Sequence, residues 1–137
     1  MSLWTHVIGV INVNMYTQSN EQTLNHARHM VAHAPKVTGS EGDMQTHVNL
    51  LNGYNHHVFD NGTDVKWQTG VVILLFGDLR DRTIEKTNKE LKAFLDYIKD
   101  NQCFMRNLSV SLTDNVTTYT YNNPYELGTL WDDEDFE

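Results

Sequence analysis

The chain has 137 residues, of which 18 are acidic and 10 basic, and its formal net charge at pH 7 is −8. This length suits one domain with a substantial core, and 39% hydrophobic and 20% charged residues are typical of a folded globular protein. The acidic balance argues against nucleic acid as a partner, because phosphate contacts need clustered lysine and arginine. The single cysteine, Cys103, excludes an internal disulfide framework and favours a reducing compartment such as the cytoplasm.

The sequence also argues against a membrane partner and against secretion. The longest apolar run, residues 71–76, is far too short for a membrane-spanning helix. The N-terminus lacks the basic and apolar regions of a signal peptide. Because no internal repeat is present, we expect one domain over residues 1–122, followed by a tail over residues 123–137.

The first half of the chain predicts a strand, a helix and a second strand. Residues 4–13 are rich in β-branched residues and apolar on both faces, which indicates a strand covered on both sides. Ser19 and Gln22 fit a capping box, and the helix that follows should end near Ala34, since Pro35 cannot continue it. Residues 45–54 predict the second strand. One face of the first strand carries Val7, Ile11 and Val13, and the other face carries Trp4, Ile8 and Val10.

The second half repeats this pattern after a projecting hairpin. Residues 55–68 contain Asp60-Asn61-Gly62, a hairpin-turn signal that predicts a two-stranded arm. The run 71–76 predicts a central strand that is buried on both faces, and residues 83–99 predict a helix. The alternation over 104–112 predicts a half-buried strand, with Phe104 among its buried residues and Met105 on the opposite face. Residues 116–121 predict a last strand.

This order of elements predicts an α+β, ferredoxin-like βαββαβ sandwich. Its sheet should be mostly antiparallel, with an extra C-terminal strand and a β-hairpin arm. The two helices should cover one face of the sheet, which leaves Trp4, Ile8 and Val10 on the other. Because that second face is apolar, we expect self-association into a homo-oligomer, unless the arm or the tail covers it.

Three histidines form the only candidate metal site in the sequence. His26, His29 and His33 are spaced three and four residues apart, so they share one side of the first helix. Three imidazoles within reach of one another can bind zinc. A solvent-exposed helix face that is rich in histidine explains the same pattern, and we expect no cofactor.

Two turns are candidates for binding an anionic ligand or a nucleotide. The turn TGSEGD, residues 38–43, contains glycines that permit a nest of backbone N–H groups, although Glu41 and Asp43 would repel a phosphate. Two arginines in the turn DLRDR, residues 78–82, could clamp a carboxylate or phosphate. The alternating charges of that turn argue instead for a locally paired, solvent-exposed turn, and a plain helix-to-strand turn is the favoured explanation of residues 38–43. The candidate ligand-binding residues are Thr38, Gly39, Ser40, Gly42, Arg80 and Arg82.

The tail combines acidic and aromatic residues. Six of its side chains are acidic, and they account for most of the net charge of the chain. Short acidic tails are usually disordered and solubilising, but the apolar residues of this one favour docking on a hydrophobic surface. The candidate partner-binding residues are Tyr125, Leu127, Trp131, Asp132 and Asp133.

Two resemblances bear on function. The topology resembles ferredoxin-like regulatory modules, including trimeric PII-like proteins, but their phosphate loop follows the second helix whereas the TGSEGD turn follows the first. The opening WTHVIGVINV together with VTGSEGDM is similar to small uncharacterised proteins of tailed bacteriophages. This second resemblance implies an accessory protein that acts in the bacterial host cytoplasm and binds a host factor, and it transfers no functional residue.

Three hypotheses for the function follow. The first is a non-enzymatic binding or regulatory protein, plausibly encoded by a phage, that binds and modulates a host protein. The alternative is a module that binds a small anionic ligand or a nucleotide through the two turns. A metal-dependent enzyme built on the histidines is the third. No nucleophile motif supports catalysis, so we predict that the chain is not an enzyme.

Overall fold

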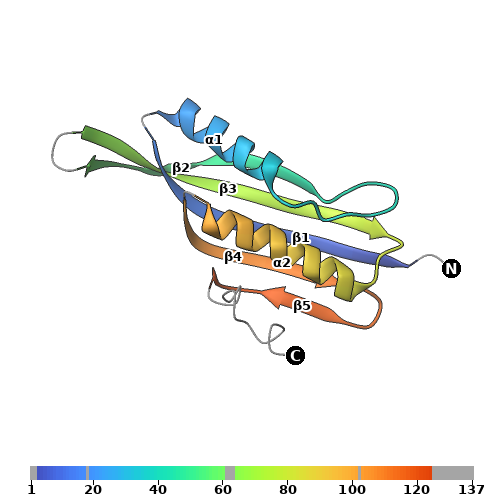
Figure 1. The fold of residues 1–137 in the computed structure, drawn as a ribbon. Coiled ribbons are helices and arrows are strands. Elements are labelled where there is room, and N and C mark those ends of the chain that lie inside the picture. Colours follow the sequence, from blue (N-terminus) through green and yellow to red (C-terminus); the bar gives the residue numbers. More distant parts are fainter. Residues whose placement is uncertain (1–2, 18, 61–63, 102, 125–137) are drawn as a thin grey trace.

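The computed structural model describes residues 3–17, 19–60, 64–101 and 103–124, and within 52–60 and 64–68 it describes only the backbone. Its elements follow one another as β-α-β-β-α-β-β (Figure 1). They are β1 (Trp4–Thr17), α1 (Asn20–His33), β2 (Gln45–Asp60), β3 (Asp64–Arg80), α2 (Ile84–Asp100), β4 (Phe104–Thr113) and β5 (Thr118–Tyr121).

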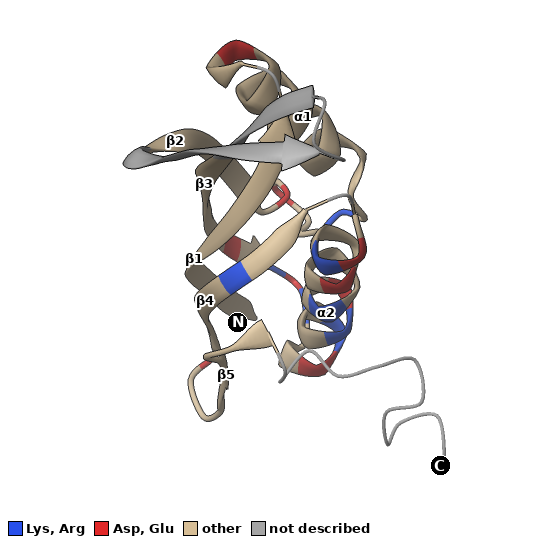
Figure 2. Cartoon of the chain, turned by 90° about the vertical axis from the view of Figure 1, so that its left-hand side faces the viewer, with Lys and Arg blue, Asp and Glu red and all other residues tan. Residues whose placement is uncertain are grey.

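The strands form one antiparallel sheet in the order β2-β3-β1-β4-β5. Both helices lie on the same side of this sheet, as Figures 1 and 2 show. The fold is therefore α+β and compatible with a ferredoxin-like arrangement, with β5 as an extra C-terminal strand at one edge. The strand in the middle of the sheet is β1, whereas the sequence predicted that the run 71–76 in β3 would be central.

Both helices begin where a hydroxyl side chain satisfies a free backbone N–H group. Ser19 Oγ accepts a hydrogen bond of 3.1 Å from Gln22 N, which confirms the predicted start of α1. Thr83 Oγ1 accepts one of 3.2 Å from Lys86 N at the start of α2. Each helix therefore starts at a residue that local chemistry selects, and the apolar residues of each helix are buried against the sheet.

The core lies between the helices and the face of the sheet that they cover, here called the covered face. Successive side chains of a strand point to opposite faces, so every second residue of β1 and β3 enters this core. The core includes Val7, Ile11, Val13 and Met15 of β1, Val71, Ile73, Leu75 and Leu79 of β3, and Leu91, Phe94, Leu95 and Ile98 of α2.

The other side of the sheet, here called the open face, faces away from both helices. The registers of the strand pairs place Trp4, His6, Ile8, Val10 and Asn12 of β1 on it, together with Val72, Leu74, Phe76, Asp78 and Arg80 of β3. Leu74 and Phe76 are 39% and 45% exposed, so the prediction that the run 71–76 is buried on both faces is wrong for this chain. The reason is that the helices cover only one face.

A β-bulge changes the predicted faces at the start of β4. The pairing of β1 with β4 shifts between Asn12 and Val13, where Asn12 pairs with Asn107 but Val13 pairs with Met105. The extra residue reverses the alternation beyond it. As a result Met105 is buried and Phe104 is exposed, the opposite of the sequence-based expectation.

The predicted hairpin arm is present in the backbone. After an irregularity between Leu50 and Asn55, β2 continues to pair with β3 up to Asp60 and Asp64. In Figure 1 this part of the hairpin extends past the end of the sheet. Asn61 and Gly62, which carry the turn signal, lie outside the described residues.

Gly9 sets the distance between β1 and β4. It pairs with Val110, and a Cβ atom on Gly9 would lie 2.7 Å from Val110 Cγ2 and 2.8 Å from Val110 Cα. Real side chains do not approach backbone atoms so closely. Glycine at this position therefore allows the two strands to pair without displacing the buried Val110.

Candidate functional site

The two turns predicted to bind an anion lie next to each other. Ser40 N donates a 3.0 Å hydrogen bond to Arg80 O, and Ser40 Oγ donates one of 2.8 Å to Asp81 Oδ2. Arg80 Nη1 lies 2.5 Å from Glu41 Oε2. The sequence alone named residues of both turns, and the structure brings them together at the end of β3.

The donors of these turns already bind acceptors within the protein. Thr38 donates to Glu90 Oε1 from its backbone nitrogen at 2.8 Å and from its hydroxyl at 2.9 Å. Arg82 Nε in turn donates to Thr38 Oγ1 at 3.3 Å. The carboxylate of Glu90, which comes from α2, therefore occupies the position that a bound anion would need. Sequence analysis did not identify Glu90, because no local pattern links it to a turn 52 residues away.

The charge of Arg80 is likewise matched inside the protein. Its pKa is raised because the guanidinium hydrogen-bonds to Glu41 and lies beside that negative charge. Gly42 adopts φ +154°, so this glycine has the backbone freedom that the sequence suggested. Together these contacts give the paired turns a role in holding the loop between α1 and β2 against the end of β3.

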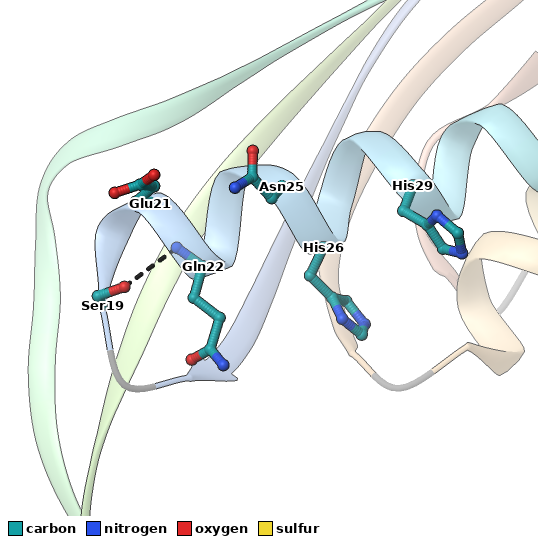
Figure 3. Close-up of a pocket in the computed structure, with 6 residues that line it drawn as sticks. All are labelled: Ser19, Glu21, Gln22, Asn25, His26 and His29. Carbon is teal, nitrogen blue, oxygen red and sulfur yellow. Dashed lines mark hydrogen bonds between the residues drawn. The ribbon is translucent and has the colours of Figure 1, made fainter.

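The three histidines of α1 do not converge on one point. The rings of His29 and His33 lie 4.0 Å apart, and His33 Nδ1 is 2.9 Å from His29 O. His26 and His29 line a shallow hollow of about 480 Å³ near the start of α1 (Figure 3). Within the described residues, no three histidine, cysteine, aspartate or glutamate side chains are placed to hold a metal ion. His26 and His33 are two helical turns, about 10 Å, apart along the axis, too far to share one zinc ion with bonds of about 2 Å.

The predicted partner-binding residues of the tail fall outside the described part of the chain. This applies to Tyr125, Leu127, Trp131, Asp132 and Asp133. The predicted tail, residues 123–137, is described only for Asn123 and Pro124.

The open face carries the largest exposed apolar surface among the described residues. Ile8 is 68% exposed, and Leu74 and Phe76 of the neighbouring strand are exposed beside it. The apolar band of this face is defined as Ile8 and Val10 of β1 with Val72, Leu74 and Phe76 of β3. Ile8 and Val10 could be predicted from the sequence as part of an apolar open face. Val72, Leu74 and Phe76 were predicted to be buried on both faces instead, although a wholly apolar run in an antiparallel sheet is a signal of an interface.

Polar side chains border the apolar band on both sides. The registers place Gln45, His47 and Asn49 of β2 along one side. They place Asn107, Ser109, Ser111 and Thr113 of β4 along the other, followed by Thr118 and Thr120 of β5. An apolar centre with an uncharged polar rim is the usual anatomy of a protein–protein interface.

Beyond the apolar band, β1 and β3 carry His6, Asp78 and Arg80 at one end of the open face, and each of these residues has a partner. His6 Nδ1 is 2.5 Å from Asp78 Oδ1, and Arg80, which pairs with Glu41, stacks over the Trp4 ring at 5.8 Å from its centroid. In Figure 2 the charged residues gather on the helices and turns, and the strands carry few. The apolar band itself contains no charge that a docking surface would have to desolvate.

Comparisons with known proteins identify no relative. No family model matches the chain, and neither a curated protein nor a solved structure resembles it significantly. Among the described residues, neither helix is both long and apolar enough to cross a membrane.

Proposed function

We propose that this chain is a non-enzymatic protein-binding module that assembles with a second copy of itself through the open face. The observation that carries the proposal is the apolar band, in which Ile8 is 68% exposed at the end next to His6 and Asp78. Isolated exposed apolar residues are common, but a contiguous band across two neighbouring strands is typical of an interaction surface.

The underlying fold in this proposal is the ferredoxin-like βαββαβ arrangement. β1 and β2 are both antiparallel to β3, which lies between them, and are therefore parallel to each other. β3 and β4 are related in the same way through β1. Each helix thus connects two parallel strands with one strand between them, which is the split βαβ unit.

The size of the open face is at the lower end of that of a standard interface. With strands about 4.8 Å apart and about 3.3 Å per residue, nine residues of each of β1, β3 and β4, six of β2 and the four of β5 form a face of roughly 600 Å². Interfaces of standard size bury about 800 Å² on each partner. Two such sheets pack face to face with their strands about 30° apart, and the helices of each copy then lie on the outside.

The arrangement of the open face is compatible with pairing to itself. The apolar band lies on the two interior strands β1 and β3, so a two-fold axis that passes through the band, in the plane between the copies, brings one band onto the other. Like charges do not meet at the centre, because the charged pairs lie at one end. Repulsion between whole chains is also small once the tail is set aside, since 12 acids and 10 bases remain from the 18 and 10 of the full chain.

The resemblance to tailed-phage proteins extends the proposal to a biological role. In this proposal the module acts in the bacterial cytoplasm and modulates a host protein by binding it. Surfaces outside the open face remain available for that partner when two copies pair.

Light scattering on Ile8→Lys tests the proposed self-association. The wild-type chain is expected at about twice its mass of 15.8 kDa, and the variant at 15.8 kDa, because a lysine at position 8 would bring a charge into the apolar interface. Val116→Lys is the matched control, since Val116 is 92% exposed in the turn between β4 and β5 and is not part of the apolar band. A monomeric wild-type chain at 100 μM, or dissociation by both variants alike, would overturn the proposal.

A further inference from the structure

A second surface with the features of a docking site runs along the outer edge of β2. β2 is the first strand of the sheet, so in the described part of the chain only one of its two edges is paired. α1 lies beside this edge (Figure 1), and a groove of about 250 Å³ separates the two. The groove is lined by Arg28, Val31, Ala32, Lys36, Thr46, His47 and Val48.

The strand edge offers backbone groups to an incoming chain. Gln45–Leu50 pairs with β3 on its inner side, and its outer side presents the remaining peptide N–H and C=O groups. An unpaired edge of this kind is a template for an added strand. The opposite edge of the sheet is formed by β5, which has only four residues. Six residues of β2 give the longer template.

The floor of the groove is apolar, and two of the residues that line it, Arg28 and Lys36, are cations. Val31 and Val48 are buried beneath the groove, and Ala32 lines it. Arg28 precedes Ala32 by one helical turn, and Lys36 follows it by four residues. Neither cation has a hydrogen-bond or ion-pair partner among the described residues, whereas Arg80 and Arg82 do. Two unmatched cations beside an apolar floor are unusual on a chain with a net charge of −8.

We propose that this groove binds an extended acidic peptide from a partner protein, which adds to β2 as a sixth strand. The partner's backbone would bond to the outer edge of β2, and its side chains on the helix side would meet Ala32 and the two cations. Because alternate residues of a strand share one face, the favoured pattern has an apolar residue at its centre and an acidic residue two positions before and after it. The two carboxylates would then lie about 13 Å apart, one for each cation.

This inference rests on the proposed protein-binding function but uses a different surface. The open face is on one side of the sheet, and the groove is at its edge beside α1; of the residues that line the groove, His47 is also on the border of the open face. Self-association therefore leaves the groove accessible, and the two proposals can fail independently.

An NMR titration of the full chain with the capped peptide Thr-Asp-Thr-Val-Thr-Asp-Thr tests the proposal. The amide signals of Thr46, Val48 and Arg28 are expected to shift saturably, and the shifts should weaken as salt rises, because the contact is partly electrostatic. A peptide of the same composition, with each aspartate moved by one residue to the opposite face, is expected to bind at least fivefold more weakly. Absence of saturable shifts with the first peptide would overturn the proposal.

Charge-reversal variants assign the binding to the groove. Arg28→Glu and Lys36→Glu are each expected to weaken peptide binding about fivefold. Each substitution removes an exposed attraction to a peptide carboxylate and adds a repulsion in its place. Lys89→Glu, at an exposed position of α2, is the matched control and should leave binding unchanged. Equal effects of all three variants would also overturn the proposal. Light scattering of Arg28→Glu should still show the dimer, which separates this inference from the proposed self-association.

Discussion

Both faces of the sheet carry apolar residues of β1 and β3, but in opposite environments. Ile73 on the covered face is fully buried, and Leu74, the next residue of β3, is 39% exposed on the open face. The pleat of the strand alone separates these neighbours. The apolar residues of the covered face stabilise the monomer. Those of the open face stay exposed because both helices lie on the covered face. An apolar residue in this sheet therefore contributes to folding or to assembly according to its face.

The largest expected difference in stability is that between truncating Ile73 and truncating Leu74 to alanine. Ile73→Ala should lower the free energy of unfolding by about 3–4 kcal/mol, because it leaves a cavity in a packed core. Leu74→Ala should cost less than about 1 kcal/mol when both are measured by urea unfolding in the monomeric Ile8→Lys background. Equal costs for the two substitutions would contradict the distinction between the faces.

A smaller loss of stability is expected from removing Glu90 of α2, which holds the loop between α1 and β2. Glu90→Ala removes the acceptor for both Thr38 N and Thr38 Oγ1. A partly buried donor without an acceptor should cost about 1–2 kcal/mol in urea unfolding. Lys89→Ala, one residue earlier and exposed, serves as the control and should stay within about 0.5 kcal/mol of wild type.

A still smaller loss of stability is expected from removing the N-cap at the start of α1. Ser19→Ala leaves Gln22 N without its acceptor, the contact drawn in Figure 3, and should destabilise the chain by about 1 kcal/mol. Ser19→Asp keeps an acceptor at the same position. Thermal unfolding should therefore rank Ser19→Asp close to wild type, and a loss as large as that of alanine would argue against capping.

The smallest effect at neutral pH concerns Cys103, which packs against the core between α2 and β4. Burial raises the pKa of its thiol from 9.0 to about 11, and its Sγ donates to Ile98 O at 3.2 Å. Between pH 9 and pH 11 the unfolded chain loses this proton while the folded chain keeps it, so stability should fall as the pH rises through this range. Burial also raises the pKa of Tyr121, which adds to the fall.

Urea midpoints at pH 8 and pH 10.5 check this prediction. Cys103→Ala should reduce the difference between the two midpoints, because the titrating thiol is gone. Alkylation of the folded chain by iodoacetamide at pH 8 should be slow, since little thiolate is present. Rapid alkylation of the native protein would show that the thiol is not protected by burial.

The sequence predicted the elements well because their signals are local. Ser19 and the spacing of apolar residues were sufficient to place α1, and alternation was sufficient to assign Val7 and Ile8 to opposite faces. Phe104 was assigned to the wrong face because a bulge is decided by pairing with β1, which alternation within β4 does not reveal. Local patterns therefore determine the elements, and long-range pairing determines which face each residue occupies.

The candidate sites were predicted less well, for the same reason. Spacing alone identified both Thr38 and Arg82, which the structure brings into contact. Thr38 donates its hydrogen bonds to Glu90 of α2 and not to a ligand. This contact depends on the packing of α2, which the spacing of residues in the sequence does not specify. The histidines share a helix side as predicted, but sharing a side over two turns does not bring three rings to one point.

The steric requirement at Gly9 bears on how distant relatives of this chain could be recognised. Any side chain there would collide with the backbone of the neighbouring strand, so a descendant that keeps this backbone must keep glycine, however far its other residues drift. Drift on the surface erases overall similarity first. A glycine opposite the residue equivalent to Val110 is thus one position that a chain with the same pairing of β1 and β4 is expected to share.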